Sequence, residues 1–223
     1  MAYFQAYTNT YDPFNTLVKK YEEALSHPKV IGLVIGTRPD CITKEILEYC
    51  KTLQNKGFYV VIEYGIESTK DETLKFINRG HNFEQSRRAI QETANYGIPV
   101  GAHMILGLPG ETREDLLSHA EKISDLPLTM LKLHQLQLVK GTVMEKQYQE
   151  HKDWFHLYSV DEYIDLVIDF LEKLNPDIIV ERFVSESPKS LLTAPDWGLK
   201  NFEFVAKLEK RLKVRDTWQG IFF

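Results

Sequence analysis

Short apolar runs alternate with amphipathic segments along the whole chain. Continuous apolar runs at residues 30–35 and 100–106 are typical of strands that are buried on both faces. Between such runs, apolar residues recur at helical spacing, as Leu17, Tyr21 and Leu25 do. Strands that alternate with helices in this way predict parallel βαβ units, so the expected fold class is α/β.

The same pattern gives expected bounds for each element. We expect strands at residues 2–7, 30–35, 58–63, 100–106, 129–139 and 178–184. We expect helices at residues 17–25, 43–54, 71–77, 83–95, 113–124, 160–174 and 207–215. Thr112 is expected to cap the helix at 113–124, whose first turn contains Glu114 and Asp115. No strand pair is joined by a two-residue hairpin turn.

Polar or glycine-rich residues follow the carboxyl end of nearly every predicted strand. These segments lie at residues 8–10, 37–38, 67–68 and 107–111. An open doubly wound sheet would fit the alternation equally well, but active sites of parallel barrels are built from such loops, which favours a barrel-type sheet. After Pro188 the pattern is less regular. We expect that tail, with Trp197, Trp218 and the terminal Phe222-Phe223, to pack back as an extension.

Several polar residues lie within or next to these apolar strands. His103 and His134 lie near the ends of successive strands, where a pocket role competes with that of hydrogen-bonded core residues. Glu63 is expected in a structural ion pair, with Arg79 or Arg182 as its partner. Glu67, at a strand end, is expected to accept hydrogen bonds from a ribose diol. Arg79 either caps the preceding helix or binds a ligand carboxylate bidentately.

Composition and absent motifs narrow the function classes. The net charge is −5, and only Cys41 and Cys50 are cysteines, which argues against a secreted disulfide scaffold and favours a cytoplasmic protein. No apolar run is long enough for a membrane span. The chain also lacks a P-loop, a dinucleotide-binding glycine motif, a His-Glu-x-x-His motif and any Cys/His cluster, so we expect no metal-ligand set within it.

Six short motifs occur in order along the chain: Tyr-Phe-Gln-Ala-Tyr-Thr-Asn-Thr-Tyr at 3–11, Ile-Gly-Thr-Arg-Pro-Asp-Cys at 35–41, Asn-Arg-Gly-His at 78–81, His-Met-Ile-Leu-Gly-Leu-Pro-Gly-Glu-Thr at 103–112, Lys-Leu-His at 132–134 and Thr-Trp-Gln-Gly at 217–220. Together they resemble a bacterial radical S-adenosylmethionine (SAM) family of Fe–S oxidoreductases. That family is related to the Elongator catalytic subunit and to oxygen-independent coproporphyrinogen oxidase.

The resemblance implies a partial TIM-type (βα) barrel at 1–185 and a C-terminal extension at 186–223. The Cys-x3-Cys-x2-Cys loop that binds the [4Fe–4S] cluster in such enzymes has no counterpart here, and two cysteines do not suffice for a cluster. We therefore expect the first strand, the cluster loop and the first helix to lie upstream of Met1. We also expect the intact enzyme to cleave SAM reductively and abstract a substrate hydrogen, and this chain alone to be inactive.

The resemblance also assigns site residues. It assigns seven positions to SAM binding: Gln5, Thr8, Asn9, Thr37, Glu67, Arg79 and His103. In the family, the first three match a segment that holds the amino group of SAM, the next two match ribose contacts, and the Arg matches a partner of the SAM carboxylate. Relatives often carry Gln where Glu67 stands. His134 is the catalytic candidate, because it is expected to face the substrate.

Two alternatives remain open at this point. A complete barrel lyase or aldolase would need a Schiff-base lysine, for which Lys132 is the one candidate on a strand. A tRNA-binding module is suggested by the Elongator kinship, although the acidic net charge disfavours nucleic-acid binding. Other expected partners are an electron donor such as flavodoxin or ferredoxin and a second copy paired through an exposed edge strand.

Overall fold

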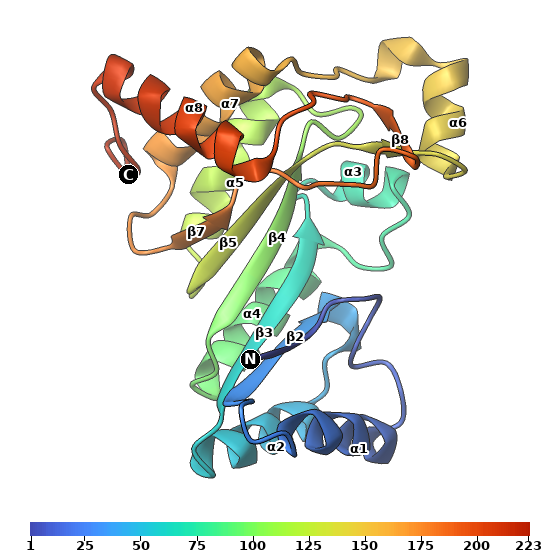
Figure 1. Ribbon diagram of the computed structural model, residues 1–223, viewed down its shortest axis with the longest axis vertical. Helices are drawn as coiled ribbons and strands as arrows, with labels where there is room; N and C mark the ends of the chain where they lie inside the picture. Colours follow the sequence, from blue (N-terminus) through green and yellow to red (C-terminus); the bar gives the residue numbers. More distant parts are fainter.

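A computed structural model describes residues 1–223 as an open, curved sheet covered by helices (Figure 1). Six parallel strands form this sheet in the order β1-β2-β3-β4-β5-β7. They span Ala2–Phe4, Gly32–Thr37, Tyr59–Glu67, Val100–Leu106, Met130–Gln135 and Ile179–Arg182. Because β1 and β7 are both edge strands, the barrel is partial and not closed. The alternation of parallel strands with helices confirms the α/β prediction.

Eight α-helices connect or follow the strands. From α1 to α8 they span Phe14–Leu25, Lys44–Asn55, Asp71–Phe76, Phe83–Asn95, Arg113–Ser124, Val143–Glu150, Val160–Lys173 and Asn201–Arg215. Local capping explains several starts, because the side chains of Thr43, Asn82 and Thr112 accept hydrogen bonds from the first turns of α2, α4 and α5. None of the helices is both long and apolar enough to cross a membrane.

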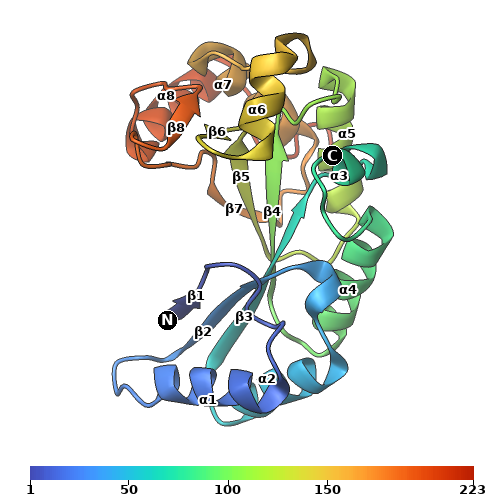
Figure 2. The same cartoon turned by 90° about the vertical axis from the view of Figure 1, so that its right-hand side faces the viewer.

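The two faces of the sheet differ in chemistry. In β3, Ile62, Tyr64 and Ile66 are fully buried in the main core, beneath helices such as α2 and α4 (Figure 2). Glu63, Gly65 and Glu67 alternate with these residues and belong to the opposite, concave face. The concave face therefore carries polar side chains, near the carboxyl ends of the parallel strands.

Two strand predictions need correction. The expected strand at 129–139 ends at Gln135, and Leu138–Val139 forms β6, which pairs antiparallel with β8 (Leu192–Ala194) in a separate two-stranded sheet. The Gln135 amide bonds to the backbone of Ser185, which holds the chain away from the main sheet. At the N-terminus, β1 ends at Phe4, and Tyr7 adopts a positive φ of 61° that interrupts an extended strand. The helix α6 and strand β8 were not expected from the pattern.

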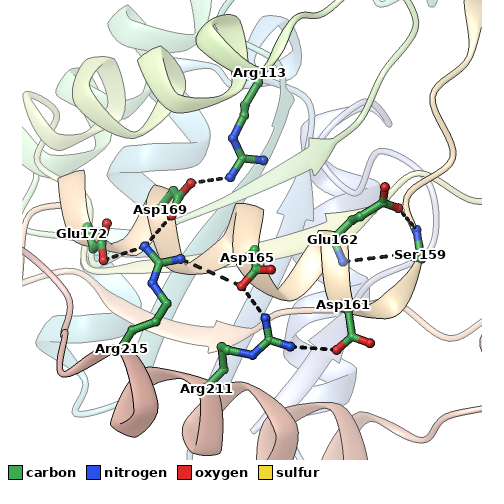
Figure 3. A network of polar contacts seen from close by, with 9 residues as sticks. All are labelled: Arg113, Ser159, Asp161, Glu162, Asp165, Asp169, Glu172, Arg211 and Arg215. Carbon is green, nitrogen blue, oxygen red and sulfur yellow. Dashed lines mark hydrogen bonds and ion pairs between the residues drawn. The ribbon is translucent and has the colours of Figure 1, made fainter.

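The C-terminal tail packs back through α8. Trp197 contacts the main core beside Tyr163, and Arg211 and Arg215 form ion pairs with the acidic side of α7 (Figure 3). The prediction that the terminal aromatics pack is wrong, because Phe222 and Phe223 are 69% and 64% exposed. At the end of the chain it is the backbone that folds back: the Phe222 N–H donates to the Glu172 carbonyl at 2.8 Å.

Candidate functional site

The concave face holds a polar cavity of about 400 Å³ at the carboxyl ends of β1 to β4. Six of the seven residues expected to bind SAM line it: Gln5, Thr8, Thr37, Glu67, Arg79 and His103. They come from segments up to about a hundred positions apart, and the parallel register of the sheet brings them together. A cavity of this volume is within the range of small-molecule sites.

The seventh residue, Asn9, lies elsewhere. Its side-chain amide donates to the carbonyls of Phe4 and Gly36, both at 2.9 Å, so it joins the ends of β1 and β2. The Thr37 hydroxyl, although it borders the cavity, is 2.5 Å from the Thr10 hydroxyl and deeply buried. The Asn9 amide and the Thr37 hydroxyl therefore both have hydrogen-bond partners within the protein.

Glu67 and Arg79 face each other across the end of β3. A β-bulge interrupts the register there, and Glu67 has a positive φ of 61°, which is unfavourable for a side chain of this kind. Arg79 Nη2 donates to the Gly65 carbonyl at 2.6 Å and lies 3.4 Å from Glu67 Oε1, so its side chain binds β3 and not the end of α3. Arg79 Nε is buried without a partner. Burial raises the pKa of Glu67, and the charges of Arg79 and His103 oppose that effect.

Beneath this pair, Glu63 accepts three hydrogen bonds. Lys132 Nζ donates to Oε1 at 2.6 Å, the Tyr3 hydroxyl donates to Oε2 at 2.6 Å, and His103 Nε2 lies 2.9 Å from Oε2. Burial alone would raise the pKa of Glu63, but these hydrogen bonds together lower it to about 2. We name these four residues the Glu63 cluster. The expected pairing of Glu63 with Arg79 or Arg182 is therefore wrong.

A glycine makes that pairing possible. Lys132 is on β5 and Glu63 on β3, with β4 between them, and Gly101 of β4 lies opposite Glu63 in the register. A Cβ atom at Gly101 would lie 2.8 Å from Cγ of Glu63. Because Gly101 has no side chain, the Glu63 side chain can pack over β4, where the Lys132 ammonium meets it. No local sequence pattern signals this contact, since it joins residues 69 positions apart.

His103 and His134 continue the chain of contacts toward a second cavity. His134 Nε2 lies 3.3 Å from His103 Nδ1, and the two rings are stacked with centroids 5.4 Å apart. The second cavity, of about 440 Å³, shares Glu67, Arg79 and His103 with the first and adds His134 and an apolar wall that includes Ile105. Burial, followed by the proximity of His103, lowers the pKa of His134 to about 3. Since His103 lines both cavities and His134 lines the second, neither histidine belongs to the apolar core.

Sequence reasoning missed two members of this site. Tyr3 was not considered for it, and Lys132 was considered as a Schiff-base lysine, not as the partner of Glu63. The usable signal was a spacing of two residues, because Tyr3 of β1 and Gln5 just after it line the same cavity. In the same way, Lys132 and His134 share one face of β5. As Lys132 is 8% exposed and bound to a carboxylate, it is not a free amine.

A partial parallel barrel with a polar mouth is the architecture of a radical SAM domain, and comparison with known proteins agrees. The family model described as "Radical SAM superfamily" matches residues 2–123, and that described as "Radical_SAM C-terminal domain" matches residues 128–214. The chain belongs to the radical SAM superfamily.

Three relatives illustrate the range of similarity. YtqA of Bacillus subtilis is 37% identical over the whole chain, which covers 68% of that protein. A tRNA uridine(34) acetyltransferase of Dehalococcoides mccartyi is 26% identical over 86% of the chain and 42% of its own length. Among solved structures, the archaeal Elp3 of Methanocaldococcus infernus superposes with a TM-score of 0.72 at 23% identity, over 85% of this chain and 43% of that one. The last similarity concerns the fold alone.

Proposed function

We propose that this chain forms the SAM-binding wall and part of the substrate wall of a radical SAM enzyme. The observation that carries the proposal is the meeting of Glu67 and Arg79 in one cavity of a chain from this superfamily. When bound, SAM supplies the 5′-deoxyadenosyl group, and a reduced [4Fe–4S] cluster supplies the electron, for abstraction of a substrate hydrogen.

The residues present fit SAM. Arg79 has a buried Nε without a partner, as expected of a guanidinium that keeps donors free for a ligand carboxylate. Glu67 presents carboxylate oxygens suited to a ribose diol, and Gln5 and Thr8 supply polar groups at the rim. The apolar wall of the adjoining cavity would exclude water from the reacting region.

The cluster itself does not fit this chain. No group of three or more His, Cys, Asp or Glu side chains is arranged to hold a metal ion, and Cys50 is buried in the main core. We therefore assign the cluster ligands to protein outside these residues and derive no step through the cluster. It follows from this assignment that the chain by itself, supplied with iron and sulfide, should bind no cluster and cleave no SAM.

The test uses the whole gene product after anaerobic iron–sulfur reconstitution. With dithionite and SAM, the wild-type protein should form 5′-deoxyadenosine. R79A removes the carboxylate partner and should raise the KM for SAM about tenfold or more, with a smaller change in kcat. R88A is the matched control, because Arg88 is an exposed arginine of α4 paired only with Glu84. Absence of 5′-deoxyadenosine from protein with a full cluster, or equal behaviour of R79A and R88A, would contradict the proposal.

A tRNA substrate is a second candidate. It is supported by the relatives named tRNA uridine(34) acetyltransferases, whereas the net charge of −5 opposes a large phosphate-binding surface on this chain. A gel shift with unmodified tRNA would distinguish a tRNA substrate from a small-molecule substrate. Specific binding at about 50 mM salt that is lost near 200 mM would favour tRNA, and no retardation at either salt would argue for a small substrate.

A further inference from the structure

Glu63, His103 and His134 form a continuous line of polar contacts from the floor of the concave face to the second cavity. The direction of each hydrogen bond can be assigned from Glu63. An ionised carboxylate only accepts, so His103 Nε2 carries a proton and donates to it. In neutral His103, Nδ1 is then an acceptor, and His134 Nε2 donates to it. This leaves Nδ1 of His134 unprotonated and without a protein partner.

We propose that these three residues are a proton relay, in which His134 is the general acid–base toward the substrate while His103 and Glu63 are positioning residues. This proposal rests on the proposed function, because the substrate is expected in the cavity that His134 lines. It names a role for Glu63 that neither the sequence nor the family match assigns.

The relay moves protons and leaves every electron pair on its own residue or on the substrate. A substrate group X–H gives its proton to Nδ1 of His134 and keeps the electron pair of the X–H bond. His134 passes its Nε2 proton to Nδ1 of His103. His103 becomes an imidazolium whose Nε2–H still donates to Glu63, so the new positive charge lies beside a buried carboxylate. The reverse sequence delivers a proton to the substrate, and no oxidant or reductant is consumed.

The charged groups around the two histidines differ in sign. His103 faces the carboxylates of Glu63 and Glu67, with Arg79 on the far side of Glu67. His134 lies near Lys132 of β5 and Arg182 of β7, whose positive charges oppose a charge on it and outweigh the opposite effect of Glu63. The low pKa of His134, caused first by burial, agrees with a group that transmits a proton and does not retain it.

The test reads the tautomers directly in the metal-free chain, by nitrogen-15 NMR of the histidine rings at neutral pH. We expect a proton on Nε2 of both His103 and His134 in the wild-type chain. In E63Q, the amide oxygen of residue 63 should take the place of Oε1 and accept from Lys132. The NH2 group, in the place of Oε2, should then donate to His103 and to the Tyr3 hydroxyl. Both tautomers should then reverse, leaving the proton of His134 on Nδ1. E181Q is the matched control, because Glu181 contacts Lys132 at 3.4 Å without bonding to His103.

A chemical probe provides a second readout. An unprotonated and unpartnered ring nitrogen attacks the carbonyl carbon of diethyl pyrocarbonate, so His134 should be modified about tenfold faster in the wild-type chain and in E181Q than in E63Q. Should E63Q not fold, the wild-type chain alone still tests the relay, because a proton on Nδ1 of either His103 or His134 would contradict it. A proton on Nδ1 of wild-type His134, or a reversal at His103 that leaves His134 unchanged, would overturn the relay. Neither readout requires SAM, so failure here is distinct from failure of the proposed enzyme activity.

Discussion

Two charged networks hold distant parts of this chain together, and they differ mainly in their exposure to water. The Glu63 cluster joins β1, β3, β4 and β5 through one carboxylate that is 3% exposed. The α7–α8 network, in which Arg211 and Arg215 bind four acidic residues of α7, is half-exposed (Figure 3). Both use ordinary ion pairs. We therefore expect burial, and not the number of ion pairs, to decide how far the free energy of unfolding falls when one partner is removed from each network.

The largest effect is expected from breaking the buried network on one side only. E63A leaves the buried Lys132 ammonium with only the part-exposed Glu181 as a counter-charge, and it should lower the free energy of unfolding by about 3 kcal/mol. The double variant E63L/K132M removes both charges and should regain most of that loss. Urea denaturation of the three proteins measures the difference. Equal stability of E63A and the wild type would mean that the cluster is open to water.

Acid should weaken the concave site, because the pKa values of His134 and Glu63 are both lowered in the folded chain. The pKa of His134 falls from 6.5 to about 3 on folding, so below pH 6.5 the unfolded chain binds a proton that the folded chain does not. Glu63, lowered from 4.5 to about 2, adds a second loss below pH 4.5. Stability should therefore decrease as the pH falls from 6.5, by a few kcal/mol in all.

The variant H134Q separates these two contributions. It should flatten the dependence between pH 6.5 and 4.5 and leave the loss below pH 4.5, as followed by thermal unfolding across this range. A wild-type curve that is flat down to pH 4.5 would show that His134 is solvated in the folded chain.

The smallest effect on stability is expected at the α7–α8 network. R215A removes contacts to Asp169 and Glu172, and since its side chain is 31% exposed the loss should be about 1 kcal/mol or less. Molar salt should reduce the difference between R215A and the wild type, whereas the deficit of E63A should persist. Urea denaturation at low and high salt measures both. A loss in R215A as large as that in E63A would remove the distinction between the two networks.

Much of the fold was predictable because it depends on local signals. The helices Phe83–Asn95 and Arg113–Ser124 and the strand Val100–Leu106 have the expected bounds. In each helix a capping side chain lies within three residues of the backbone group that it binds. The strand is an uninterrupted apolar run that is buried by helices. Such signals need no knowledge of distant residues.

The site was predictable only in part. The resemblance to the radical SAM family assigned Gln5, Glu67, Arg79 and His103 to one ligand, and they do line one cavity. The partner of Glu63 was not predictable, because it depends on the register of three strands and on the missing side chain of Gly101. The separation of β6 from β5 was also hidden, since it follows from contacts to Ser185.

The sequence by itself determined the α/β class, the order of the elements and the membership of a radical SAM family, because periodicity, capping and short motifs are properties of neighbouring residues. The tertiary structure decided which charges meet. Lys132 and Glu63 are 69 positions apart, and only the parallel alignment of β3, β4 and β5 places an ammonium 2.6 Å from a carboxylate. Electrostatic pairing depends on distance in space and on exclusion of water, and neither quantity is contained in local sequence.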